Sequence, residues 1–118
     1  MATAYYDADD FYFVKSSTNQ IRLSVGLGQE MNGGYLIFHG DQLIAANADG
    51  FLKQQNFIDD WLTVSVIMKD KPDNRNWASV ILTLQEDSQI PKTFGPFRKE
   101  MEKSIDTICY TFKIKIRN

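Results

Sequence analysis

The C-terminal segment from Thr107 to Arg117 alternates between apolar residues and polar or small residues without interruption. Its large apolar positions are Ile108, Tyr110, Phe112, Ile114 and Ile116. A period of two over this length places these side chains on one face of a β-strand, whereas a helix would spread them around its circumference. The segment therefore predicts a half-buried strand. Its other face carries Lys113, Lys115 and Arg117, which we expect to form a solvated stripe.

Two further segments, 61–69 and 77–85, show the same alternation. Their apolar faces are Leu62, Val64, Val66 and Met68 in the first, and Ala78, Val80, Leu82 and Leu84 in the second. Between them lies a run of turn-forming residues that includes Pro72. We expect a β-hairpin in which Lys69 pairs with Trp77.

The N-terminal half contains shorter candidate strands. They are residues 11–15, 21–27, 35–39 and 43–46, with turns at Gly40-Asp41 and at 47–50, where Asp-Gly suits a positive φ. Only residues 96–103 favour a short helix or turn, since a proline precedes good helix formers.

About seven strands with frequent turns are typical of an all-β fold. We therefore predict an antiparallel β-sandwich, or alternatively a small β-barrel, that forms a single β domain over residues 1–118. Its core should be formed by residues from three strands, namely Val64, Val66, Val80, Leu82, Phe112 and Ile114.

Charge and composition bear on partners and location. The formal net charge of −2 gives no basic excess for nucleic acid, and no apolar run is long enough to span a membrane. A single cysteine allows no internal disulfide, which favours the cytoplasm. The acidic N-terminus does not resemble a signal peptide. The alternative is an exported protein from which a signal peptide has been removed.

The candidate catalytic residues are few. His39 is the only histidine, which excludes sites that need two imidazoles, and we interpret it as a turn-edge residue bonded to the backbone. Cys109 has threonines beside it on its strand face and no neighbouring base. The aspartates at 7, 9, 10, 59 and 60 leave a hydrolase as a third hypothesis. We expect no enzyme and no cofactor.

The loops at one end offer a different ligand site. If the strands run up and down, Asp49, Asp70 and Asp73 share one end of the domain. Calcium prefers several oxygens from such loops, although turns are rich in aspartate for local reasons as well. A ligand-binding β-sandwich, for calcium or a carbohydrate, is therefore the alternative function.

The face of the predicted hairpin that points away from the core carries large apolar residues. They are Trp61, Ile67, Trp77 and Ile81. Solvent-facing strands normally carry polar residues, so these four need a cover. The cover is either the aromatic N-terminal segment, with Tyr5, Tyr6 and Tyr12, or another protein chain. We favour the second. The sequence thus predicts a non-enzymatic protein-interaction domain, a subunit or adaptor that binds another protein or forms a homo-oligomer.

Overall fold

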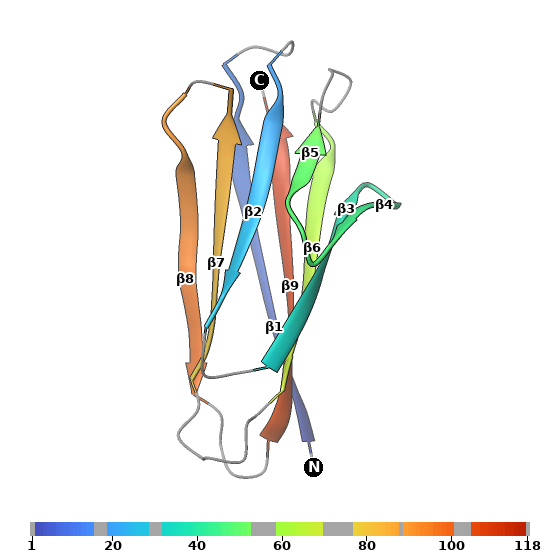
Figure 1. The fold of residues 1–118 in the computed structure, drawn as a ribbon, viewed down its shortest axis with the longest axis vertical. Helices are drawn as coiled ribbons and strands as arrows, with labels where there is room; N and C mark the ends of the chain where they lie inside the picture. The colour runs from blue at the N-terminus through green and yellow to red at the C-terminus, as the bar shows by residue number, and fades with distance from the viewer. Residues whose placement is uncertain are drawn as a thin grey trace.

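The computed structural model describes residues 2–15, 19–28, 32–52, 59–69, 77–87, 89–100 and 105–117. In these ranges the chain forms nine β-strands and no helix (Figure 1). The strands are β1 (Ala2–Phe13), β2 (Ile21–Leu27), β3 (Asn32–His39), β4 (Gln42–Ala46), β5 (Gly50–Leu52), β6 (Trp61–Lys69), β7 (Trp77–Glu86), β8 (Lys92–Glu100) and β9 (Ile105–Arg117). Six of them match the prediction in place, β1 overlaps the strand predicted at 11–15 only at its end, and β5 and β8 are additional.

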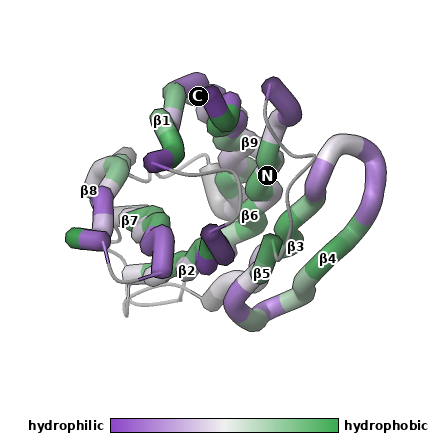
Figure 2. The backbone as a smooth tube through the Cα atoms, turned by 90° about the horizontal axis from the view of Figure 1, so that it is seen from above, coloured by the Kyte–Doolittle hydropathy of each residue, from purple (hydrophilic) through white to green (hydrophobic). Residues whose placement is uncertain are grey.

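The strands form two sheets that pack face to face. The five-stranded sheet has the order β1-β9-β6-β3-β4, and the four-stranded sheet has the order β5-β2-β7-β8. Seen along the long axis, these are two rows of strands (Figure 2). The predicted β-sandwich is confirmed. The alternative of a closed barrel is wrong, because the two sheets are separate.

The buried faces of the long strands are the predicted ones. All six predicted core residues are at most 1% exposed: Val64, Val66, Val80, Leu82, Phe112 and Ile114. The full apolar faces of β6, β7 and β9 are buried with them. Alternation alone was enough here, because each strand has one face against the opposite sheet and one face in solvent.

The predicted hairpin between β6 and β7 is wrong. β6 lies in the five-stranded sheet between β3 and β9, and β7 lies in the four-stranded sheet between β2 and β8. Lys69 is aligned with Thr107 of β9, and Trp77 is aligned with Glu100 of β8. The chain therefore crosses between sheets at this point. Alternation specifies which face of a strand is buried, but it does not specify which strand lies beside it.

The predicted helix or turn at 96–103 is also wrong over its described part, because Pro96–Glu100 belongs to strand β8. Residues 101–103 lie outside the described residues. Phe94 is buried and Phe97 packs on Phe112 with ring centroids 4.7 Å apart, so tertiary packing overrides the local helix preference. A register shift opposite Ile81 lets this edge strand accommodate its proline.

The N-terminal segment forms a long edge strand. β1 begins at Ala2 and pairs in parallel with β9, whereas the other pairs of described strands are antiparallel. The N-terminal segment was one of the two covers predicted for the apolar face of the hairpin. That prediction is wrong, because the segment lies at the edge of a sheet and does not fold across a face. Its inward side chains Ala4, Tyr6 and Ala8 pack against the core. The prediction of a strand starting at Phe11 therefore missed most of β1.

The hairpin of β3 and β4 is confirmed, with His39 aligned with Gln42 across the Gly40-Asp41 turn. In the following turn, the positive φ is at Asn47 (53°) and not at the expected Asp-Gly pair. Asn47 suits this conformation because a short polar side chain tolerates left-handed geometry. Its Oδ1 accepts a hydrogen bond of 2.8 Å from the N–H of Tyr35, which fixes the turn.

Candidate functional site

The four residues of the predicted apolar patch do not share a surface. Trp61 and Ile67 lie on β6 in one sheet, and Trp77 and Ile81 lie on β7 in the other. The side chain of Trp77 lies outside what the structure describes. Ile81 is half-buried, and its side chain lies over Gly26 of its own sheet, where an added Cβ would come within 2.8 Å of the Ile81 Cγ2 atom. The surface predicted from the hairpin is therefore corrected to two separate surfaces.

The three predicted tyrosines of β1 also separate. Tyr5 is 75% exposed on the outer face. Tyr6 faces inward and its ring lies 5.3 Å from that of Tyr110. Tyr12 is buried, and its hydroxyl donates a 2.9 Å hydrogen bond to Glu86. Of the three, only Tyr5 presents its ring to solvent.

Glu86 is a buried carboxylate that the sequence reasoning missed. Besides the Tyr12 hydroxyl, it accepts hydrogen bonds from the N–H of Lys15 at 2.9 Å and from the side-chain amide of Asn19. Burial, followed by the hydrogen bond and charge of Glu86, raises the pKa of Tyr12 to about 12. The sequence does indicate that Glu86 is buried, because it lies two positions after Leu84 and so on the same inward face of the strand. These contacts join the end of β1 to β7, which is a structural role.

The outer face of the five-stranded sheet mixes aromatic and basic side chains. The predicted stripe lies here on β9, but two of its three cations contact aromatic rings. The Lys115 ammonium is 5.6 Å from the ring centre of Trp61. The Arg117 guanidinium is 5.9 Å from that of Phe11 and 3.5 Å from a carboxylate oxygen of Asp59. These contacts shield part of the apolar surface with cations.

Exposed apolar side chains are concentrated on this sheet. Among the described strand residues, the large apolar side chains above one-third exposure on this sheet are Tyr5, Phe11, Phe13, Leu36, Leu43 and Ile67. The four-stranded sheet has only Phe51 among its described residues, and Ile90 is exposed outside the strands. A hollow of about 370 Å³ also lies on this sheet, lined by Asp9, Gly40, Asp41, Trp61, Thr63 and Lys113. This outer face therefore has the aromatic character of interaction surfaces.

The free edge of β1 borders the same face. Successive residues of a strand direct their N–H groups to opposite sides. The N–H of Val14 bonds to the Arg117 carbonyl next to β9, so even-numbered residues face β9 and odd-numbered ones face outward. The outward N–H of Phe11 is capped by the neighbouring Asp10 carboxylate at 2.8 Å. The edge from Thr3 to Asp9 has no neighbouring strand among the described residues.

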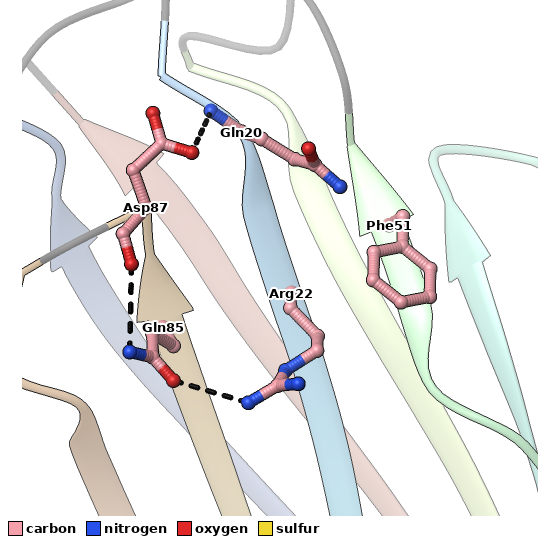
Figure 3. Close-up of a pocket in the computed structure, with 5 residues that line it drawn as sticks. All are labelled: Gln20, Arg22, Phe51, Gln85 and Asp87. Carbon is pink, nitrogen blue, oxygen red and sulfur yellow. Dashed lines mark hydrogen bonds between the residues drawn. The ribbon is translucent and has the colours of Figure 1, made fainter.

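A second hollow, of about 340 Å³, lies on the outer face of the four-stranded sheet (Figure 3). Its lining residues are Gln20, Arg22, Phe51, Gln85 and Asp87. Arg22 is aligned with Phe51 on one side and with Gln85 on the other, so three neighbouring strands supply one row of the hollow. None of these residues was a sequence candidate. Phe51, Arg22 and Gln85 are brought together by the register of β5, β2 and β7, which the sequence does not reveal.

The chemistry candidates have defined surroundings. The His39 ring bonds to the Asp60 carboxylate at 2.8 Å, so the expected backbone bond is replaced by a side-chain partner. Cys109 is half-buried and aligned with Tyr5 and Ile67. Asp49 is exposed, whereas Asp70 and Asp73 lie outside the described residues, so the calcium site stays a prediction. Within the described ranges, no group of three histidine, cysteine, aspartate or glutamate side chains is placed to hold a metal.

The described part of the chain has no helix that is long and apolar enough to cross a membrane.

Comparisons with models of known protein families, with curated proteins and with solved structures give no match.

Proposed function

We propose that this chain is a non-enzymatic protein-interaction domain that binds an extended, basic segment of another protein along the free edge of β1. The observation that carries the proposal is the edge itself. β1 is 12 residues long and has a neighbour on one side only among the described strands. Unpaired strand edges are templates for an added strand, and soluble proteins usually keep them short or covered.

The available edge has a defined length. Thr3, Tyr5, Asp7 and Asp9 direct their backbone groups outward, whereas at Phe11 the Asp10 carboxylate already occupies the N–H. An added strand can therefore pair from Thr3 to Asp9 and ends where the cap begins. The cap acts as a stop for pairing, in the manner of edge-protecting side chains.

The chemistry of the partner follows from the side chains on β1. Asp7 and Asp9 are exposed on the outer face, with the exposed ring of Tyr5 beside them. Opposite charges on adjacent strands stabilise a sheet, and like charges directly opposite destabilise it. A partner strand with lysine or arginine opposite the two aspartates fits. A second copy of β1 paired antiparallel about Asp7 would face its own aspartate.

The inward face of β1 indicates that the partner segment must also carry apolar side chains. Ala8 is small, and a small cavity of about 30 Å³ opens between it and the Phe97 and Phe112 rings. Alternate side chains of an added strand would point toward this gap. The partner segment should therefore alternate basic residues with apolar ones.

The test uses a fluorescently labelled synthetic peptide that alternates lysine with valine, and a matched peptide with glutamate in place of lysine. We expect anisotropy to show binding of the lysine peptide and at least about tenfold weaker binding of the glutamate peptide. Asp7→Pro should abolish binding, since it removes an outward N–H and leaves the pairs with β9 intact. Asp41→Pro, on the Gly40-Asp41 turn of another edge, is the matched control.

Three results would overturn the proposal. They are equal binding of both peptides, undiminished binding by a folded Asp7→Pro variant, and absence of binding by the lysine peptide at millimolar concentration. A stable wild-type dimer that Asp7→Pro dissociates would show instead that the occupant of the edge is a second copy. Light scattering measures this on the same samples.

A further inference from the structure

We infer that the hollow on the outer face of the four-stranded sheet is a binding site for a neutral carbohydrate. This site goes beyond the proposed function and lies on the opposite sheet from β1. The inference rests on the arrangement in Figure 3, where the Phe51 ring, the Arg22 guanidinium and the Gln85 amide lie side by side on three neighbouring strands. Gln20 and Asp87 close its upper end.

Hydrogen bonds hold the polar groups in place without a ligand. The Gln85 Oε1 atom accepts a hydrogen bond of 3.1 Å from Arg22 Nη2, and the Gln85 Nε2 atom lies 3.4 Å from the carbonyl oxygen of Asp87. The Asp87 carboxylate in turn accepts a hydrogen bond of 3.1 Å from the N–H of Gln20. A site whose side chains are already ordered loses less conformational entropy when it binds.

The groups that face the hollow match hydroxyl groups. The guanidinium of Arg22 uses one N–H for Gln85 and has others to donate, and the second oxygen of the Asp87 carboxylate can accept. Sugar hydroxyls both donate and accept, so they use the two kinds of group together. Arg22 and Asp87 also cancel in charge, which favours a neutral ligand over an anionic or cationic one.

Phe51 supplies the apolar contact. It is 47% exposed, and its ring borders the hollow opposite Gln85 (Figure 3). Because a pyranose ring has one face of C–H groups, it packs on an aromatic ring while its hydroxyls reach the polar groups. The volume of about 340 Å³ is at the small end of the usual range for ligand sites and suits a mono- or disaccharide unit.

The neighbouring row of the sheet extends the site. Ser24, Thr83 and Thr93 are aligned across β2, β7 and β8, one step along the outer face from Arg22 and Gln85. All three are hydroxyl residues with at least partial exposure. They offer donors and acceptors to further units of a chain, so the site should prefer oligosaccharides to monosaccharides.

The experiment is a titration with cellohexaose, xylohexaose and maltohexaose, followed by amide chemical shifts and calorimetry. We expect at least one of them to bind with a dissociation constant of about a millimolar or below, with shifts centred on Arg22, Phe51 and Gln85. Phe51→Ala should weaken binding about tenfold, and Phe51→Tyr should retain it. Leu43→Ala, an exposed apolar residue on the other sheet, is the control that should change nothing.

Absence of shifts with all three sugars at about 10 mM would overturn the inference. So would binding that Phe51→Ala leaves unchanged, or tighter binding of a polyuronate than of every neutral sugar. The Asp7→Pro variant distinguishes this site from the edge of β1, because it should lose the lysine peptide and keep the sugar. The Phe51→Ala variant should show the reverse, so each site can fail without the other.

Discussion

The hydroxyl of Tyr12 donates a 2.9 Å hydrogen bond to the buried carboxylate of Glu86, 74 positions further along the chain. This contact connects the two sheets, since Tyr12 lies on β1 and Glu86 on β7. Burying a carboxylate costs free energy unless its oxygens accept several hydrogen bonds, and here the backbone of Lys15 and the side chain of Asn19 contribute as well. The bond therefore fastens the end of β1 across the sandwich.

Removing this bond should destabilise the fold without affecting either proposed site. Tyr12→Phe is expected to lower the free energy of unfolding by about 1.5–3 kcal/mol, the usual value for a hydrogen bond to a charged group. Tyr5→Phe is the matched control, because its hydroxyl lies in solvent on the same strand and should change stability by less than about 0.5 kcal/mol. Urea denaturation measures both, and equal values would contradict the structural role of the contact.

Stability should fall steeply above pH 10. Burial raises the pKa of Tyr12 and of Tyr110 from 10.0 to about 12. The Glu86 carboxylate adds to the rise at Tyr12, and Tyr6 adds to the rise at Tyr110. Above pH 10 the unfolded chain therefore binds fewer protons than the folded one, so ionisation favours unfolding. The contribution of each tyrosine is complete below pH 10 and is lost as the pH rises toward 12, by about 1.4 kcal/mol per pH unit.

Denaturation midpoints from pH 8 to pH 12 test this. Tyr12→Phe should make the decline shallower, because one of the tyrosines with a raised pKa is gone. A decline of the same slope in wild type and variant would assign the effect to other groups.

How far the sequence predicts this fold depends on what alternation can determine. It correctly places the buried faces of β6, β7 and β9, because a half-buried strand needs one apolar face. It does not determine neighbours, which is why Trp61 and Trp77 were expected on one surface although their strands belong to different sheets. Turn residues between two strands indicate a change of direction, and both a hairpin and a crossing to the other sheet satisfy that.

The candidate sites likewise combine residues that the sequence points to with neighbours that it does not determine. Tyr5 was an interaction candidate because aromatic residues cluster near the N-terminus, and the structure leaves it 75% exposed beside the proposed edge. The edge beside it was not predicted, because the parallel pairing of β1 with β9 joins opposite ends of the chain. The row of Phe51, Arg22 and Gln85 depends on the register of three strands, and no local pattern of residues marks it.

The core can be tested by a single truncation. Leu82 is 1% exposed in the middle of β7, so Leu82→Ala should lower the free energy of unfolding by about 2–5 kcal/mol. Leu43→Ala removes the same atoms from a side chain that is 50% exposed and should cost far less. Chemical denaturation of the two variants compares them, and a loss below about 1 kcal/mol at Leu82 would be inconsistent with a tightly packed interior.

The predicted calcium site can be tested separately. If the end loops bind Ca²⁺, the melting temperature of the wild type should rise with millimolar calcium, and Asp70→Asn together with Asp73→Asn should remove that rise. Asp49→Asn tests the third predicted ligand, and Asp41→Asn, on a different turn, is the control. Calorimetry without a heat of binding at millimolar calcium would rule the site out.

The last prediction concerns the contact between Gly26 and Ile81, which are aligned on β2 and β7. A Cβ at position 26 would lie 2.8 Å from the Cγ2 atom of Ile81, closer than side-chain atoms pack. Replacing glycine by alanine in a compatible strand normally stabilises a protein by about 0.4–1 kcal/mol through the unfolded state. At this position the clash should reverse the sign, so Gly26→Ala should be destabilising.

A double-mutant cycle separates the two effects. In the Ile81→Ala background the obstructing methyl group is absent, so adding Gly26→Ala should be neutral or stabilising. The coupling energy between the two positions should then be at least about 0.5 kcal/mol, as is usual for residues in direct contact. Additive effects would mean that Ile81 adopts another rotamer at no cost and that Gly26 is not needed to accommodate it.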